Sequence, residues 1–101
     1  MQTFFVKYKV KDSSPESIRE WADFLITHQA EVLESLHDEG IALELAALDE
    51  QADGLYLVYV MKAADINKVF KALEISKRAV DVFHKETLPT LLGNPQKLDI
   101  L

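Results

Sequence analysis

The sequence has no cysteine, and its 101 residues include only three glycines and three prolines. Without cysteine there is no disulfide, no thiolate nucleophile and no cysteine-ligated metal. No apolar run approaches the roughly 20 residues that a membrane-spanning helix needs, and residues 1–7 lack the basic start and apolar stretch of a secretion signal. We therefore expect one soluble, cytoplasmic domain over residues 1–101, without a membrane partner.

Positive charge is also in short supply, and the net charge is −6. Residues 12–53 include twelve acidic residues and one base, whereas residues 54–97 include seven bases and four acidic residues. Nucleic acid is bound through clustered Lys and Arg, so this charge excludes a nucleic-acid partner. The acidic half is typical of a solvated first helix; alternatively, the asymmetry would help two copies of the chain attract one another.

A hydrophobic period of two predicts strands at residues 3–10 and 41–48, and a nearly continuous apolar run predicts a third strand at residues 55–61. Residues 96–101 can add a last strand. The two middle strands are joined by a polar loop that ends in Asp53-Gly54, a hairpin signal. In the last strand, Leu98 and Ile100 are expected to point inward.

A period of 3.6 predicts two helical excursions between these strands. The first runs from a capping box at residues 13–16 to about residue 39, and Gly40 ends it as a left-handed cap. The second comprises a short helix over residues 64–74 and, after the cap residue Ser76, a further helix to about residue 91. The apolar stripe of the first helix consists of Ile18, Trp21, Ala22, Leu25, Val32, Leu33 and Leu36.

The βαββαβ order predicts an α+β, ferredoxin-like sandwich in which helices cover one face of an antiparallel sheet. Strand alternation directs one set of side chains toward the helices: Phe4, Val6, Tyr8, Leu43 and Leu45. It leaves another set on the open face: Phe5, Lys7, Lys9, Glu44 and Ala46. The third strand adds to the open face either Leu55, Leu57, Tyr59 and Met61 or Tyr56, Val58 and Val60. Because either set leaves roughly a few hundred Å² of apolar surface in water, we expect a two-fold homodimer through this face.

Two runs of the predicted first helix carry a family likeness, Glu20-Trp21-Ala22-Asp23-Phe24-Leu25 and Ala30-Glu31-Val32-Leu33. Together with the element order and the open sheet face, they resemble the dimeric α/β-barrel superfamily. Within it, the chain is similar to one of the small, uncharacterised bacterial families. The superfamily includes cofactor-independent monooxygenases, lactone isomerases, dehydratases and heme-degrading enzymes. The resemblance therefore implies a dimer with an internal pocket, but no particular reaction.

His84 is the candidate catalytic residue, because it lies on the apolar stripe of the last predicted helix. In superfamily enzymes a pocket often lies between the sheet and the helices, and a histidine there could act as a general acid or base. We expect Tyr8 and Trp21 to line this pocket with it. The alternative is a histidine at the margin of the core that donates to a backbone carbonyl.

Lys7, Lys9 and Glu44 form an alternative ligand-binding set on the predicted open face. Inside a dimer they could bind an anionic ligand, or one of the lysines could pair with Glu44, since buried charges need partners. Phe24 and His28 lie beside the main stripe of the first helix, where they could pack on a neighbouring subunit or stack on a ligand.

We expect neither a metal nor a cofactor. No two of the three histidines have ligand spacing on one face with a carboxylate, and no glycine-rich phosphate loop is present. Two hypotheses of function remain. The first is a small-molecule-binding or enzymatic homodimer with a mainly apolar pocket, and the second is a non-enzymatic module for association with itself or another protein.

Overall fold

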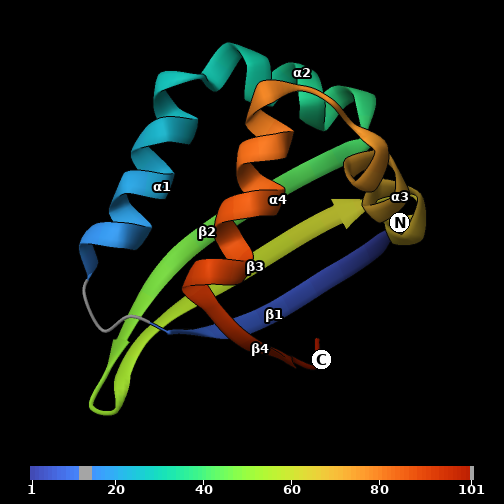
Figure 1. Cartoon of the computed structure of the whole chain (residues 1–101). Coiled ribbons are helices and arrows are strands. Elements are labelled where there is room, and N and C mark those ends of the chain that lie inside the picture. The colour runs from blue at the N-terminus through green and yellow to red at the C-terminus, as the bar shows by residue number, and fades with distance from the viewer. Residues whose placement is uncertain (12–14, 101) are drawn as a thin grey trace.

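The computed structural model describes residues 1–11 and 15–100. Within them, four strands form one antiparallel sheet in the order β2-β3-β1-β4, and four helices complete an α+β fold. The elements are β1 (Gln2–Val10), α1 (Pro15–Thr27), α2 (Gln29–Asp38), β2 (Ile41–Gln51), β3 (Gly54–Ala63), α3 (Ile66–Ile75), α4 (Ala79–Leu91) and β4 (Leu92–Lys97). The helices lie on one side of the sheet, and α1 and α4 run side by side across it (Figure 1).

The predicted first helix is in fact two helices. His28 separates α1 from α2 with φ −103° and ψ 31°, and its ring Nδ1 lies 2.8 Å from the carbonyl oxygen of Phe24, to which it donates. A side chain that bonds to a carbonyl one turn earlier locally competes with helical geometry. Gly40 has φ +76°, which confirms the predicted left-handed cap. The predicted capping serines, Ser13 and Ser14, lie outside the described residues.

The second excursion follows its prediction more closely. Asp65 caps α3 by accepting hydrogen bonds from the backbone N–H groups of Asn67 and Lys68, at 3.1 and 3.3 Å. The hydroxyl of Ser76 accepts a hydrogen bond from the Arg78 N–H at 3.2 Å, just before α4 begins. The chain breaks at Ser76 as predicted, but Ser76 is the C-cap of α3, and α4 begins two residues later than predicted, at Ala79 with Arg78 as its N-cap.

A β-bulge near the start of β2 overturns the predicted alternation of that strand. Ile41 pairs with Ala63 and Leu43 pairs with Lys62, so two residues of β2 face one residue of β3. An extra residue reverses which face each later side chain occupies. The prediction is therefore wrong for Leu43 and Leu45, which lie on the open face, and for Glu44 and Ala46, which point toward the helices.

The last strand begins earlier than predicted. β4 follows α4 directly because Leu92 is buried against Val10, with which it is paired in the sheet. Pro95 fits because β4 is an edge strand, where a missing backbone N–H is tolerated. The inward placement of Leu98 and Ile100 is wrong, since both side chains are exposed.

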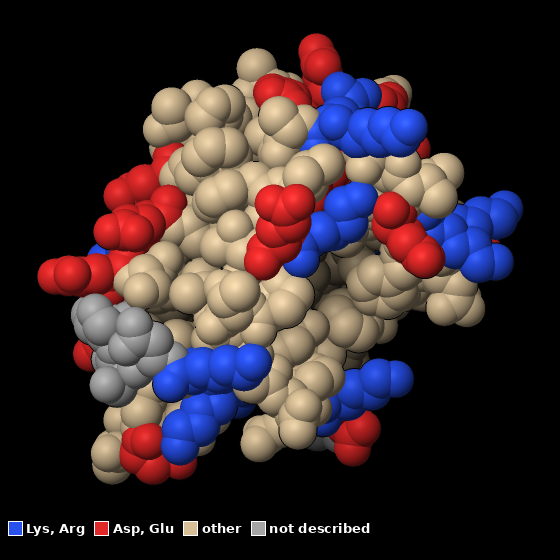
Figure 2. Space-filling view, in the orientation of Figure 1, with Lys and Arg blue, Asp and Glu red and all other residues tan. Residues whose placement is uncertain are grey.

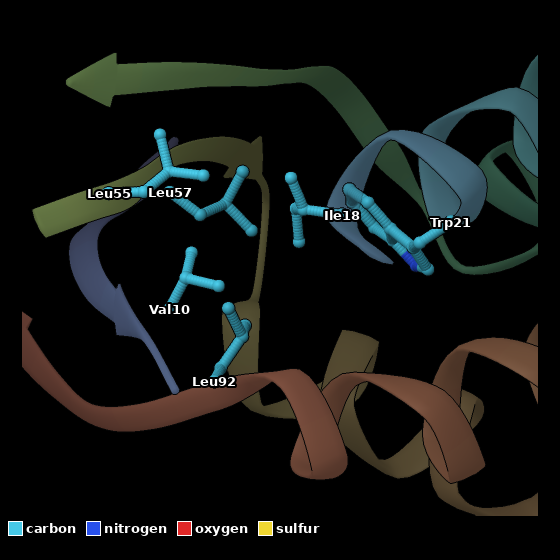
Figure 3. Packing of buried hydrophobic residues seen from close by; sticks show 6 residues of the cluster. All are labelled: Val10, Ile18, Trp21, Leu55, Leu57 and Leu92. Carbon is cyan, nitrogen blue, oxygen red and sulfur yellow. The ribbon is translucent and has the colours of Figure 1, made fainter. Parts of the chain in front are cut away.

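The core consists of two apolar clusters between the sheet and the helices. In the larger one, Ile18 and Trp21 of α1 pack toward strand residues and the start of β4 (Figure 3). The smaller one joins Val69 of α3 to Met61 and Ala63 of β3. These clusters fix the helices at both ends of the sheet and leave the space between them for a cavity.

None of the four described helices lies on the opposite face of the sheet. Of the two sets left open by the sequence, Tyr56, Val58 and Val60 lie here, whereas Leu55, Leu57, Tyr59 and Met61 face the helices. The bulge adds Leu43 and Leu45, which are 49% and 59% exposed. The open face is therefore apolar along β2 and β3.

Charge is distributed unevenly over the surface. Acidic side chains gather on the side of the molecule where α1 lies, while basic side chains lie chiefly toward α3 and along the lower edge of the view (Figure 2). Among the described residues, no helix is both long enough and apolar enough to span a bilayer.

Candidate functional site

A cavity of about 470 Å³ lies between the sheet and the helices. All eight elements contribute to its wall, which is mainly apolar, with Phe4 and Met61 on the sheet side and Leu25, Val32 and Phe70 on the helix side. Cavities that bind small molecules have roughly this size and are lined by apolar groups with a few polar ones. The polar groups of this wall decide what the cavity can do chemically.

Glu44 and Tyr59 form one polar group on the sheet wall. They lie on the neighbouring strands β2 and β3, and the Tyr59 hydroxyl donates a hydrogen bond to Glu44 Oε1. Burial raises the pKa of Glu44, although the bond from Tyr59 opposes that rise. Burial and the adjacent carboxylate also raise the pKa of Tyr59, which keeps its proton. Because of the bulge in β2, this carboxyl group points to the same side of the sheet as Ile41.

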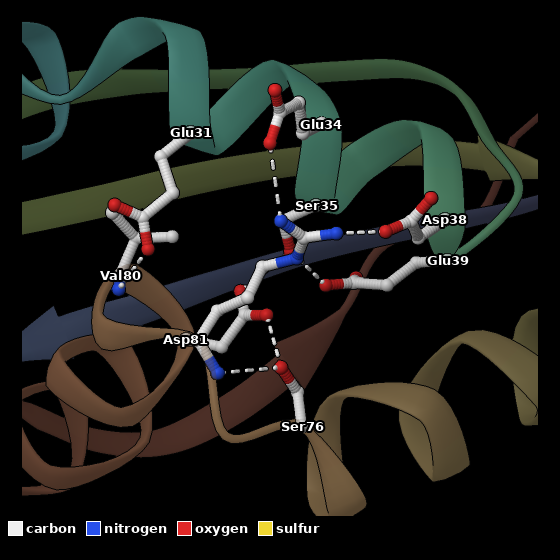
Figure 4. A network of polar contacts seen from close by, with 9 residues as sticks. Glu31, Glu34, Ser35, Asp38, Glu39, Ser76, Val80 and Asp81 are labelled. Atoms are coloured by element: carbon white, nitrogen blue, oxygen red, sulfur yellow. Dashed lines mark hydrogen bonds and ion pairs between the residues drawn. The ribbon is translucent and has the colours of Figure 1, made fainter.

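Asp81 of α4 forms a second polar group, and its residue is 7% exposed. It accepts hydrogen bonds from the hydroxyls of Ser35 at 2.6 Å and Ser76 at 2.5 Å (Figure 4). These two bonds tie α4 to α2 and to the segment after α3. A buried carboxylate is stable only with such partners.

Ser35 bridges Asp81 to a further carboxyl group. Its Oγ lies 2.7 Å from Oε1 of Glu39 as well as 2.6 Å from Asp81. A hydroxyl has one proton to donate, so the second contact requires a proton on one of the two carboxyl groups. Burial raises the pKa of Glu39, although the bond from Ser35 and the charge of Arg78 oppose the rise, and a raised pKa favours the proton on Glu39. The chain Glu39–Ser35–Asp81–Ser76 can therefore hold a proton at the cavity wall.

His84 lies one helical turn after Asp81 and lines the same cavity. Burial lowers its pKa, with the nearby charge of Asp81 opposing the effect, so the imidazole is neutral at pH 7. Its ring centroid is 5.8 Å from that of Trp21. Within the described part of the chain, the buried indole N–H of Trp21 has no acceptor.

The three predicted pocket residues lie together, because Tyr8, Trp21 and His84 all line the cavity. The residues of the alternative ligand-binding set, Lys7, Lys9 and Glu44, do not lie together. Lys7 pairs with Asp49 at 3.3 Å, and its ammonium group lies 4.3 Å from the centroid of the Tyr56 ring. Lys9 approaches Asp53 at 4.0 Å. Glu44 lies on the other face of the sheet. Placing Glu44 with the lysines was wrong because the bulge reverses its direction.

Phe24 also has a partner that the sequence did not indicate. Its ring stacks on Phe83 of α4 at 3.8 Å between centroids and on His28 at 4.2 Å. Phe24 therefore joins α1 to α4 within one chain and does not need a neighbouring subunit. Its stack closes one side of the helical layer.

Sequence reasoning missed Asp81, Ser35, Glu39 and Tyr59 as site residues. A signal existed for Asp81, which is a charged residue within the apolar run Ala79-Val80-Asp81-Val82-Phe83. Another existed for Glu44, the only charge in residues 41–48. No sequence signal marked Ser35, because its role depends on how closely α2 approaches α4.

Glu44→Gln is expected to stabilise the protein at pH 7 by about 1 kcal/mol, because it removes a partly buried charge and keeps an acceptor for Tyr59. The pKa of Glu44 is raised in the folded state, so the folded chain binds a proton that the unfolded chain releases. Stability is then lost as the pH rises from the ordinary carboxyl pKa through the raised one.

Urea denaturation of the wild type and of Glu44→Gln at pH 7 and at pH 4 tests this expectation. The gain should be present at pH 7 and absent at about pH 4, below the ordinary pKa of the carboxyl group. A variant that is less stable than the wild type at pH 7 would show that the carboxylate has a compensating partner.

Within residues 1–11 and 15–100, no group of three or more His, Asp and Glu side chains is arranged to hold a metal ion. The model of one protein family, DUF6176, described as a family of unknown function, matches residues 1–99 of the chain. No curated protein matches the chain.

Proposed function

The chain belongs to DUF6176, a family of unknown function, and on that premise we propose that it binds a small, mainly apolar molecule in the cavity between sheet and helices. The observation that carries the proposal is the cavity of about 470 Å³, whose mainly apolar wall includes three carboxyl groups and His84. Packed interiors of small domains rarely leave this much space, so the space itself indicates a ligand.

The same wall supports an enzymatic role. A general base must be unprotonated at the working pH and within reach of the substrate. His84 meets the first condition because burial lowers its pKa, and it lies on the cavity wall. The proton held by Glu39, Ser35 and Asp81 could be returned to a bound molecule. We therefore propose His84 as the base and this chain of groups as the acid.

For the fold, we propose a ferredoxin-like sandwich of the dimeric α/β-barrel type. The sheet order β2-β3-β1-β4 and the helices on a single face support it. In such an assembly the open faces of two sheets pack together, and each protomer keeps its own cavity on the helix side. The proposal thus assigns association and ligand binding to opposite faces of one sheet.

Filling the cavity tests the binding proposal. Ala46 lines the cavity, and Ala47, the next residue of β2, points to the open face. We expect N-phenyl-1-naphthylamine, a weakly basic dye that is neutral at pH 7 and fluoresces in apolar sites, to bind the wild type. Ala46→Phe should weaken its affinity at least about tenfold, because the new ring occupies the cavity, and Ala47→Phe should not.

Dye fluorescence titrations give both dissociation constants directly. Equal affinities for the two variants would mean that the dye binds elsewhere and would remove the support for this cavity. Native mass spectrometry of protein purified from its own host then shows which molecule the wild type retains and how many copies of the chain assemble.

A second candidate function is self-association without catalysis. The observation that favours it is the apolar open face, where Leu43 and Leu45 are largely exposed beside Val58 and Val60. Exposed apolar patches of this kind on small proteins mark contact surfaces. This candidate needs no ligand, so the dye titration distinguishes it from the first.

A further inference from the structure

The described wall of the cavity includes acidic side chains but no strongly basic ones. Glu39, Glu44 and Asp81 line it, and none of the described lining residues is a lysine or an arginine. Arg78 is the base closest in sequence to Asp81, but its guanidinium group pairs with Glu34 and Asp38 on the outer side of α2 (Figure 4). Arg78 also lies near enough to act on the charges of Asp81 and Glu39 from outside the wall, so Glu44 is the carboxyl group of the cavity for which the described residues provide no base.

The carboxyl group of Glu44 can accept a further hydrogen bond. Among the described residues only Tyr59 donates to Glu44, through Oε1, which leaves Oε2 without a donor. A carboxylate in a partly buried site gains more from a cation than one in water, because the lower local dielectric strengthens the attraction. The same carboxylate repels an anionic ligand and gains nothing comparable from a neutral one.

The remainder of the wall favours an apolar body with an aromatic part. Phe4 and Phe70 meet edge to face, with centroids 5.2 Å apart, and Leu25, Ile26 and Leu73 complete the lining around them. Aromatic rings attract cations as well as apolar groups. Apolar groups and a group that can bind a cation thus line the same cavity.

We infer that the ligand of this cavity is an amphiphilic amine, with an apolar or aromatic body and a protonated amino group that binds at Glu44. The inference rests on the proposed function, because it names the class of molecule that the same cavity takes. The amino group contacts Glu44 Oε2, and the apolar body lies between the sheet and the helices.

Three probes of matched shape test the inference: 3-phenylpropylamine, 3-phenylpropan-1-ol and 3-phenylpropanoate. At about pH 8, where the amine is protonated and carboxyl groups are ionised, calorimetry should show the amine binding at least about tenfold more tightly than the alcohol. The carboxylate should bind most weakly of the three. This comparison of the three affinities uses the wild-type protein alone.

The Glu44→Gln variant tests whether the charge of Glu44 causes the preference for the amine over the alcohol. It should bring the affinity for the amine to within about threefold of that for the alcohol and leave the alcohol unchanged, since the amide retains the shape but not the charge. Glu50→Gln is the matched control, because it removes the same charge from an exposed position at the far end of β2 and should preserve the preference.

The outcomes separate the two proposals. An alcohol or a carboxylate that binds as tightly as the amine overturns the inference and leaves the cavity as a binding site. An amine preference that survives Glu44→Gln also overturns it, since the charge would then act elsewhere. If none of the three probes binds, the proposed function fails together with the inference.

Discussion

Replacing Asp81 with alanine is expected to lower the free energy of unfolding by about 3 kcal/mol, because it removes the buried acceptor that the hydroxyls of Ser35 and Ser76 share. Asp81 receives hydrogen bonds from Ser35 at 2.6 Å and from Ser76 at 2.5 Å. In a domain of this size, a loss of 1 kcal/mol lowers the melting temperature by about 4–8 °C. Thermal unfolding followed by circular dichroism should therefore show a fall of more than about 10 °C.

The control for this variant is Asp38→Ala. Asp38 is exposed and pairs with Arg78 at the surface, so its loss should cost less than about 1 kcal/mol. Ser76→Ala should fall between the two, since it removes one donor and leaves Asp81 bonded to Ser35. Equal losses for Asp81→Ala and Asp38→Ala would show that the buried network contributes no more than a surface ion pair.

Replacing Leu45 with glutamate is expected to convert a homodimer to a monomer at micromolar concentration. Leu45 is 59% exposed in the single chain, beside Leu43 on the open face of the sheet. A dimer through this face would bury both side chains, and a buried unpaired carboxylate costs several kcal/mol at each of two symmetric positions. The dissociation constant should rise more than about 100-fold.

Sedimentation equilibrium of the wild type and two variants measures this effect. Ile75→Glu is the matched control, because Ile75 is 77% exposed at the end of α3 and lies off the open face. It should leave the dimer intact. A wild type of 11.5 kDa at every concentration would contradict the dimer and, with it, the proposed barrel assembly.

Local pattern predicted the elements that tertiary contacts do not modify. Phe4, Val6 and Tyr8 face the helices as their alternation indicates, since β1 pairs with β3 in unbroken register. Gly40 adopts the left-handed geometry that its position after a helix predicts. In these places the residue and its immediate neighbours determine the conformation.

The candidate site was only partly predictable for the same reason. Tyr8, Trp21 and His84 were found because each lies on the apolar side of its own element. Glu44 was assigned to the wrong face, because a bulge depends on the pairing with β3 and leaves no mark in the hydrophobic pattern. Ser35 could not be found, since its neighbour Asp81 lies 46 positions away in the chain.

The single additional residue in β2 has a consequence for which side chains can share the cavity. From Leu43 to Gln51 the pairing with β3 is regular up to the hairpin, so deleting Ala42 would leave Glu44 inside and Leu43 and Leu45 outside. In a regular strand, residues three positions apart point to opposite faces of the sheet. The extra residue is therefore what allows Ile41 and Glu44, an apolar residue and an acid of one strand, to line the same space.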